Sequence, residues 1–282
     1  MKQATAFLLL LALLGLLFGC GSSTDAPLLT VHFLDVGQGD AILLRTGEGD
    51  ILIDAGTEDS EFYLCSRLKE LGVKSLLLAV FTHLDEDHIG GADGVLNQFA
   101  PREIWLSNMP VWEVGADLSV SRLMEAASKC GAEVTVVKRG DSYAISSLTI
   151  SVLSPIDDKE QDANRGSIVL KLHCDKTNAI FTGDADTAME AELIRLFGAS
   201  QLDCDLYKAG HHGSSTSGSQ AFLQAMTPEW TVISCGEGNM YGHPSGLVLS
   251  NLEQVGSTVL RTDLLGEIVF VCDGERWTPA EK

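Results

Sequence analysis

Basic residues are scarce in this sequence. It contains 19 Lys and Arg residues against 39 Asp and Glu residues, which gives a formal net charge of −20 at pH 7. A negative balance of this size keeps a protein soluble and opposes broad, non-specific binding to nucleic acid. A polyanionic substrate would therefore be held locally by metal ions, because the chain has few cations with which to build a basic face.

Closely spaced cysteine pairs are also absent. No Cys-x-x-Cys pair occurs, so a structural zinc knot is not expected. Cys20 aside, the cysteines are Cys65, Cys130, Cys174, Cys204, Cys235 and Cys272. Their wide, irregular spacing does not match the disulfide framework of a small secreted domain. We interpret several of them as small hydrophobic core residues.

The hydrophobic run near the N-terminus is short for a membrane span. The apolar run at residues 4–18 follows Lys2 and is shorter than the roughly 20 residues that a membrane helix needs. Its length and position are typical of the hydrophobic region of a signal peptide. Leu17–Cys20 resembles the lipobox of bacterial lipoproteins, in which cleavage before the cysteine exposes it for lipidation.

We therefore expect residues 1–19 to form a lipoprotein-type signal peptide. Residues 20–28 would then be the lipidated Cys20 and a short tether. The protein would be exported and held on the outer face of the cytoplasmic membrane. An uncleaved membrane anchor is the alternative, and it leaves the rest of the chain on the same side.

No fixed-period repeat and no low-complexity linker interrupts the remaining sequence. Short apolar runs bounded by glycine, such as residues 29–34 and 41–45, predict strands, and residues 60–71 have the period of a helix. The second half, from about residue 167, repeats this mixture of strands and helices. Two such halves without a break favour one α/β domain over residues 29–275, with two sheets packed face to face under helices.

Ligand-type side chains concentrate in Thr82–Gly91. This segment follows a predicted buried strand and precedes a helix, so it occupies the carboxyl end of a strand, where α/β sites form. It contains His83, Asp85, Asp87 and His88, whose imidazole nitrogens and carboxylate oxygens are ligands that Zn and Mn accept. We expect the first two to face one metal position and the last two a neighbouring one. An acidic helix N-terminus is the alternative, but it requires neither two histidines nor the Gly-Gly that follows.

Two further aspartates follow predicted strands. Asp54 precedes Ala-Gly, where it either orients the metal loop from beneath through hydrogen bonds or forms a turn. Asp184 comes after a strand and a glycine, so its carboxylate emerges at the end of a sheet. The alternative for Asp184 is the N-cap of the following helix.

Histidines recur later in the chain. His211 and His212 stand between two glycines after a predicted strand, and we expect His211 to be a metal ligand and His212 to contact the substrate. His243 lies in a Tyr-Gly-His-Pro turn and is a candidate to give a proton or a hydrogen bond to a leaving group. The alternative is that these histidines have structural roles alone.

The metal loop resembles the H-x-H-x-D-H signature of the metallo-β-lactamase superfamily, with Asp85 in the place of the second histidine. That substitution and the flanking motifs are similar to the hydrolase domain of ComEC-type DNA-uptake proteins. The large membrane-channel region of those proteins is absent, so we expect a free-standing hydrolase domain. The resemblance covers residues 29–271, and its motifs are Phe33–Ala41, Ile53–Gly56, Thr82–Gly91, Thr182–Asp184, His211–Ser214, Tyr241–Pro244 and Arg261–Asp263.

The resemblance implies a four-layer αββα sandwich that holds one or two divalent metal ions, Zn or Mn, with Asp184 as the bridging ligand. Many members supply another histidine before that aspartate, where this chain has Asn164-Arg165-Gly166-Ser167. His173, within a predicted strand of the same interval, is interpreted as structural. Arg165 could hold a phosphate as a charge-assisted donor.

The expected site residues fall into three overlapping sets. The metal ligands are His83, Asp85, Asp87, His88, Asp184 and His211. The catalytic residues are Asp87, Asp184, His212 and His243. The residues expected to contact substrate are Asn164, Arg165, Ser167, His212 and His243.

These residues predict metal-dependent hydrolysis. A bound divalent ion lowers the pKa of a coordinated water to about 7 and so supplies hydroxide at neutral pH. The resemblance implies phosphodiester bonds of DNA as the substrate, with the membrane, through the lipid anchor, and a DNA-uptake channel as expected partners. A local basic groove that includes Arg165 and Lys208 would favour DNA.

Three alternatives remain open at this point. The first is a phosphoesterase that acts on teichoic acid or another cell-wall polymer. The second is a hydrolase of lactams, lactones or thioesters, which Asp85 and the missing histidine disfavour. The third is a catalytically inactive binding lipoprotein that keeps the fold.

Overall fold

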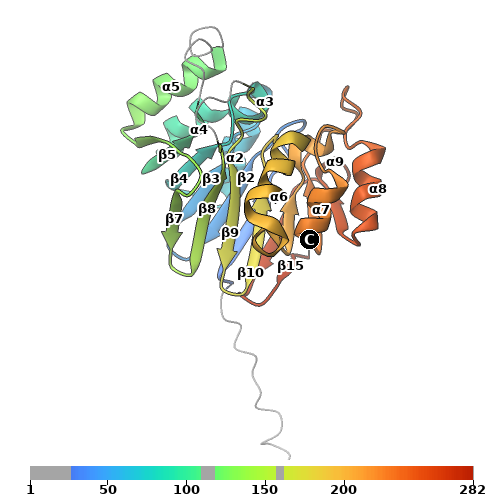
Figure 1. Cartoon of the computed structure of the whole chain (residues 1–282). Coiled ribbons are helices and arrows are strands. Elements are labelled where there is room, and N and C mark those ends of the chain that lie inside the picture. The colour runs from blue at the N-terminus through green and yellow to red at the C-terminus, as the bar shows by residue number, and fades with distance from the viewer. Residues whose placement is uncertain (1–26, 109–117, 157–161, 282) are drawn as a thin grey trace, which may run out of the picture.

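The computed structural model describes residues 27–108, 118–156 and 162–281. Within these ranges the chain forms two β-sheets packed face to face, with helices on both outer sides (Figure 1). The layers are therefore helix, sheet, sheet and helix, which confirms the predicted αββα sandwich. The expected signal peptide and Cys20 lie outside the described residues.

The first sheet has the strand order β15-β14-β1-β2-β3-β4-β5-β6. Its pairs are antiparallel from β15 to β3 and parallel from β3 to β6. Its strands are β1 (Leu29–Phe33), β2 (Ile42–Thr46), β3 (Asp50–Ile53), β4 (Leu76–Phe81), β5 (Glu103–Leu106), β6 (Glu133–Val136), β14 (Ile268–Cys272) and β15 (Trp277–Pro279).

The second sheet has the order β13-β12-β11-β10-β9-β8-β7. Its pairs are parallel from β13 to β10 and antiparallel from β10 to β7. Its strands are β7 (Ser142–Ile145), β8 (Leu148–Ser154), β9 (Val169–Cys174), β10 (Thr177–Phe181), β11 (Leu206–Lys208), β12 (Trp230–Ile233) and β13 (Thr258–Arg261).

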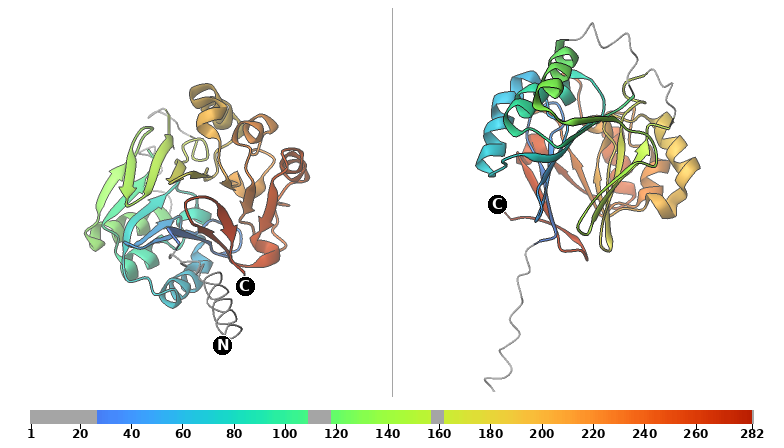
Figure 2. Two further views of the ribbon diagram at one scale, coloured as in Figure 1. Left: turned by 90° about the horizontal axis from the view of Figure 1, so that it is seen from below. Right: turned by 90° about the vertical axis from the view of Figure 1, so that its left-hand side faces the viewer.

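Helices from each half of the chain cover the outer face of one sheet, and Figure 2 shows the two groups on opposite sides of the molecule. On the first sheet, apolar side chains of α2 (Glu61–Glu70), α4 (Ala92–Phe99) and α5 (Leu118–Cys130) pack against the strands. On the second, α6 (Thr187–Leu202), α7 (Gln220–Met226) and α8 (Gly246–Gln254) do the same. Four short helices complete the described ranges: η1 (Glu58–Ser60), α3 (Glu86–Ile89), η2 (Gly210–Gly213) and α9 (Thr262–Leu265).

The main core lies between the sheets. Phe33 of the first sheet is fully buried, and its ring centre lies 6.2 Å from that of Phe181 on the second sheet and 6.3 Å from that of Phe270. Every residue of β4 is buried because sheet covers one face of this strand and helices cover the other. An apolar run of this kind is what a strand with both faces covered requires.

The cysteines of the described ranges are free, and all but Cys130 are buried. This agrees with their interpretation as core residues. No helix in the described ranges combines the length and the apolar character that crossing a bilayer requires.

The ends of the predicted elements differ from the structure at two sheet edges. The predicted domain ends at residue 275, but the fold continues through β15 to Pro279. The edge strand β7 was not predicted, because the polar and apolar residues of its sequence do not alternate clearly. Edge strands receive less burial than central ones, so their sequences carry a weaker signal.

The inter-sheet core predicts a large difference between two phenylalanines. Replacing buried Phe33 with Ala should lower the free energy of unfolding by about 3–5 kcal/mol, since it leaves a cavity between the sheets. Phe62 is 85% exposed, so its replacement with Ala should change that quantity by less than about 0.5 kcal/mol. Urea unfolding of the two variants measures the contrast, and equal effects would contradict the described packing.

Candidate metal centre

The predicted metal loop joins β4 to α3 at the carboxyl end of the strand. His83 and Asp85 lie on the loop, and Asp87 and His88 lie on the short helix. Asp85 is the N-cap residue of α3, but its carboxylate makes no capping hydrogen bond and lies 3.6 Å from the His83 ring. A Cβ at Gly90 would lie 2.2 Å from the backbone nitrogen of Glu58, so only glycine allows this close packing of α3.

Asp54 holds the loop from beneath, the first of the two alternatives considered for it, and its φ of 58° places it in a left-handed turn as well. One carboxylate oxygen accepts from the Thr82 backbone N–H at 2.7 Å, and the other accepts from the Thr82 hydroxyl at 2.7 Å and from His88 Nδ1 at 2.8 Å. Because the Thr82 hydroxyl donates to Asp54, it accepts from His83 Nδ1 at 3.2 Å. Both rings therefore carry their proton on Nδ1 and turn Nε2 away from Asp54.

His212 is oriented in the same way from the other sheet. Its Nδ1 donates to the backbone carbonyl of Ser234 at 3.1 Å. The Nε2 atoms of His83, His88 and His212 are all buried and have no hydrogen-bond partner within the described part of the chain. Fixing Nδ1 and leaving Nε2 open is how proteins prepare histidines as metal ligands.

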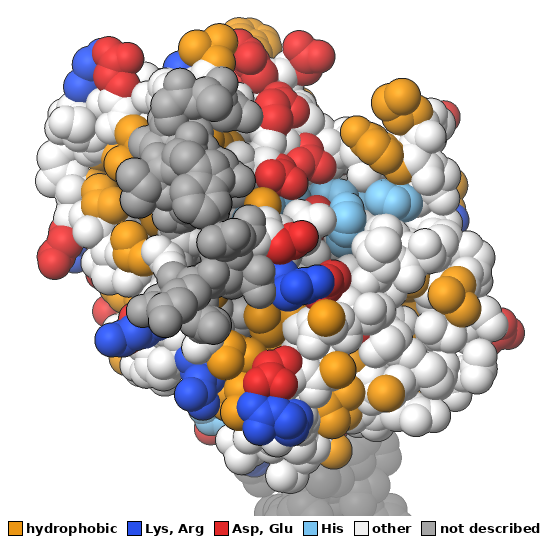
Figure 3. Space-filling model, turned by 45° about the horizontal axis from the view of Figure 1, so that its top comes forward, with side chains coloured by type: hydrophobic (Ala, Val, Ile, Leu, Met, Phe, Trp, Pro, Cys, Tyr) orange, Lys and Arg blue, Asp and Glu red, His pale blue; other side chains and the backbone are white. Residues whose placement is uncertain are grey.

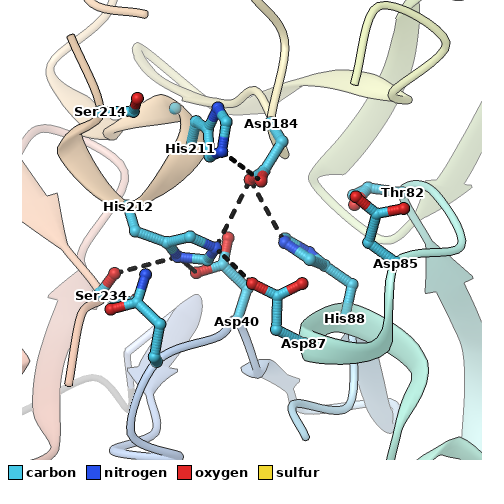
Figure 4. Close-up of polar contacts among 12 residues, drawn as sticks. Asp40, Thr82, Asp85, Asp87, His88, Asp184, His211, His212, Ser214 and Ser234 are labelled. Atoms are coloured by element: carbon cyan, nitrogen blue, oxygen red, sulfur yellow. Dashed lines mark hydrogen bonds and ion pairs between the residues drawn. The ribbon is translucent and has the colours of Figure 1, made fainter. Parts of the chain in front are cut away.

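Asp184 lies at the centre of these groups (Figure 4). Its carboxylate oxygens lie 3.2 Å from Nε2 of His88, 3.6 Å from Nε2 of His211, 3.7 Å from Nε2 of His212 and 3.9 Å from Nε2 of His83. The backbone N–H of Asp184 donates to the buried Ser167 hydroxyl at 3.2 Å. The carboxylate thus faces imidazoles that come from both sheets.

The two adjacent histidines adopt an unusual backbone conformation. His211 and His212 both have positive φ, 49° and 53°. Two non-glycine residues in the left-handed region are strained, and such strain is found where function requires a particular side-chain direction. The turn buries His212 and leaves His211 at the rim, a quarter exposed.

This turn favours His212, not His211, as the metal ligand, the reverse of our expectation. His212 Nε2 also lies 3.2 Å from Asp87, and the two form a ligand group with His88. His211 keeps a hydrogen bond between Nδ1 and Thr216 at 3.0 Å and faces the open side. The sequence could not rank the two neighbours, because the left-handed turn decides which ring points inward.

A buried ion pair supports the centre from below. Lys208 Nζ lies 2.9 Å from Asp40, both side chains are almost fully buried, and the same Asp40 oxygen lies 3.4 Å from His212 Nδ1. Lys208 therefore cannot contribute to a basic groove, the feature that would favour DNA, since this ammonium does not reach the surface. Asp40 belongs to the Phe33–Ala41 motif. Its role, to pair with Lys208 of the second sheet beneath His212, could not be predicted from that motif alone.

The charges of the cluster reinforce one another. Burial alone would lower the pKa of both His88 and His212. The carboxylates of Asp184 and Asp54 instead raise the pKa of His88 well above its usual value. Asp184 and Asp40 raise the pKa of His212 to about 9. Burial alone would raise the pKa of Asp184, but the histidines hold it well below its usual range. Without a metal ion, protons on the imidazoles balance the buried carboxylates.

The residues present fit a divalent metal ion. Ligand atoms of His83, His88 and Asp184 lie within 4.8 Å of one another, as do those of Asp87, His88 and His212. Buried nitrogen and oxygen atoms without partners, three of them imidazole, match the ligand preference of zinc and manganese. Asp184 borders both groups, so two neighbouring metal positions are available, although His88 Nε2 can bind only one ion at a time. Asp85 stands beside the first position.

The expected substrate residues have different surroundings. Ser167 is fully buried, and its hydroxyl accepts a hydrogen bond from the Asp184 backbone N–H. The prediction that Ser167 contacts the substrate is therefore wrong. Arg165 Nε donates to Asp186 at 3.2 Å. The side-chain oxygen of Asn164 is buried without a hydrogen-bond partner among the described residues. The ring centre of His243 lies 5.8 Å from that of His211, at the rim.

Metal binding should release protons. The raised pKa values of His88 and His212 keep both rings protonated at pH 7 in the metal-free chain, and a metal ion must displace both protons. We expect about two protons to be released per Mn²⁺ or Zn²⁺ at pH 7, and metal affinity to rise with pH up to about 9, where His212 loses its proton. Calorimetry in buffers of different ionisation enthalpy measures both.

A surface histidine supplies the control for this measurement. His173 of β9 is exposed and bonds to Asn178 at 3.0 Å, away from the metal loop, in agreement with the structural role assigned to it. The His173→Gln variant should release the same number of protons as the original chain. Metal binding without proton release, or with an affinity independent of pH, would contradict the described cluster.

Comparisons with known sequences agree with this site. Residues 34–112, which include the metal loop, match the family described as the Metallo-beta-lactamase superfamily. The chain is 32% identical over 258 residues to ComE operon protein 3 of Bacillus subtilis, covering 85% of this chain and 32% of that protein. It is 31% identical over 237 residues to Competence protein ComA of Neisseria gonorrhoeae, covering 84% of this chain and 31% of that protein. The chain thus spans about a third of the length of these relatives.

Solved structures agree with the fold. The metallo-beta-lactamase fold protein YhfI of Bacillus subtilis superposes with a TM-score of 0.57 at 12% identity, covering 86% of this chain and 99% of that one. A metallo hydrolase from Ignicoccus hospitalis gives a TM-score of 0.55 at 15% identity, covering 86% and 98%. At these identities the likeness concerns the fold alone. Together with the sequence matches, it shows that the chain has the metallo-β-lactamase fold and is similar over most of its length to part of two bacterial competence proteins.

Proposed function

We propose that this chain is a metal-dependent phosphodiesterase that cleaves DNA. The observation that carries the proposal is the meeting of three unpartnered imidazole Nε2 atoms around the buried Asp184 carboxylate. Similarity to competence proteins over most of the chain supports DNA as the substrate.

The chemistry needs a divalent ion, which when bound supplies hydroxide at neutral pH and neutralises charge on a phosphodiester. The protein's contribution is to hold the ligands ready. Asp184 stays ionised, because the surrounding histidines keep its pKa well below the usual range. Asp54 and Ser234 fix the rings of His88 and His212, so little reorganisation is needed when the ion binds.

His243 is placed to assist the leaving group. Gln38 is oriented by the Gly236 N–H, which donates to its side-chain oxygen at 3.1 Å, so its amide nitrogen donates to His243 Nδ1 at 3.4 Å. The proton of the neutral ring is then on Nε2. Burial, together with the nearby charges of His212 and His211, lowers the pKa of His243, so the ring stays neutral at pH 7 and offers an N–H donor to a departing oxygen.

The nuclease proposal is tested with purified protein, Mn²⁺ or Zn²⁺, and single-stranded and duplex DNA. The original chain should cleave, and Asp184→Asn should lower the rate by roughly 10²-fold or more, the scale expected when a charge-stabilising group is lost from an active site. Asp175→Asn is the matched control, because Asp175 is an exposed turn residue with φ 53°, a conformation that Asn tolerates.

The outcomes separate the alternatives. Intact DNA in the presence of a metal-loaded protein would reject the nuclease proposal. Hydrolysis of teichoic acid by that same protein would then favour the wall phosphoesterase. Metal binding with no turnover of either polymer would favour a binding lipoprotein.

The location of the protein is proposed from its N-terminal sequence. Residues 17–20 resemble a lipobox, and we propose that the exported chain is held at the membrane through lipid on Cys20. Cells that express the chain should incorporate radiolabelled palmitate into it, and Cys20→Ala should abolish the label. Cys130→Ala, within the domain, should leave the label unchanged. A membrane-bound chain that carries no label would reject the lipid anchor.

A further inference from the structure

Two large apolar side chains are exposed close to the metal centre. Met240 is 90% exposed and Tyr241 is 66% exposed. The Tyr241 ring stacks on His243, with ring centres 5.6 Å apart and planes 24° apart. The His243 ring lies 5.8 Å from that of His211, which contacts Asp184. Tyr241 is thus connected to the centre of the ligand cluster through two intervening rings.

The loop that presents Tyr241 is internally braced. The Asn239 side chain donates to the carbonyl oxygens of Gly236 at 2.9 Å and His243 at 2.7 Å, and it accepts from the His243 N–H at 3.0 Å. Gln38, in the loop between β1 and β2, accepts a hydrogen bond from the Gly236 N–H and so fixes the start of the loop. Folding therefore holds the tyrosine in a defined position while leaving its ring largely exposed and available to a planar partner.

The charge around the centre favours approach along this loop. Acidic side chains gather beside the histidines in Figure 3, and the exposed carboxylates of the metal loop include Asp85, which is 50% exposed, and Glu86. These groups repel phosphates. Residues 236–245 contain one carboxylate, Glu237, and no Lys or Arg.

Basic residues give little help at this site. Lys208 is buried on Asp40, and Arg165 is engaged by Asp186. In a chain with a net charge of −20, a polyanion cannot be gripped through broad electrostatic attraction. An attraction that does not depend on charge is required, and the face of an aromatic ring provides one to any nucleobase.

We propose that the exposed face of Tyr241 is a stacking platform for a nucleobase of single-stranded DNA. The inference rests on the proposed nuclease function and names the form of its substrate. The base would stack on Tyr241 while a neighbouring phosphate reaches the metal centre. Duplex DNA keeps its bases paired and stacked on one another, so their faces are not available to the tyrosine.

The test measures binding of the full-length chain to a fluorescently labelled single-stranded oligonucleotide. EDTA is present, so no cleavage occurs. Tyr241→Ala should weaken binding by roughly tenfold or more, the scale of one lost base–aromatic stack, and Tyr241→Phe should retain it. Phe62→Ala removes an exposed aromatic ring from α2 and should have no effect. Binding should depend weakly on salt, with a slope that corresponds to no more than about two neutralised phosphates.

Each failure has its own meaning. If Tyr241→Ala binds as well as the original chain, or Tyr241→Phe binds as poorly as Tyr241→Ala, the stacking platform is rejected while the nuclease assay stands by itself. A steep salt slope, or equal losses for duplex and single strand, also rejects it. If Tyr241→Ala weakens binding but the metal-loaded protein leaves DNA intact, the platform is supported and the nuclease function fails.

Discussion

A carboxylate buried among imidazoles is the interaction on which the rest of this site depends. Asp184 comes from the second sheet and meets His83 and His88 from the first. Removing such charges from water is unfavourable by several kcal/mol unless they are paired. Protons can balance them, as the raised pKa values of the histidines show, but a divalent cation does so more fully. Packing the two sheets together at this edge therefore brings Asp184, His83 and His88 into a cluster that a divalent cation would stabilise.

The part of the site whose ligands lie close together in the chain could be predicted from the sequence. The histidines and aspartates of Thr82–Gly91, which follow a buried strand, made the metal loop recognisable. Contacts between distant segments could not be predicted. The pairing of Lys208 with Asp40 links the two halves of the fold, and it buries a cation that could otherwise have contributed to a basic groove.

The same limit applies to His211 and His212. The two residues are of the same type and adjacent in the chain. The left-handed turn after β11 directs the His212 ring into the core and the His211 ring to the rim. That turn also places His211 between the buried cluster and His243, so the rim histidines form a path from the metal centre to Tyr241. Backbone conformation here assigns roles that side-chain chemistry alone leaves equal.

The central claim is that a metal ion lies among these side chains, and anomalous diffraction from crystals soaked in Mn²⁺ or Zn²⁺ tests it most directly. Data collected above the absorption edge of the metal should show a peak about 2.0–2.2 Å from Nε2 of His88 and His212 and from an Asp184 oxygen. A second peak bordered by His83 and Asp184 would show that both positions are filled. The absence of any peak within reach of Asp184, in protein that binds the metal in solution, would contradict the account.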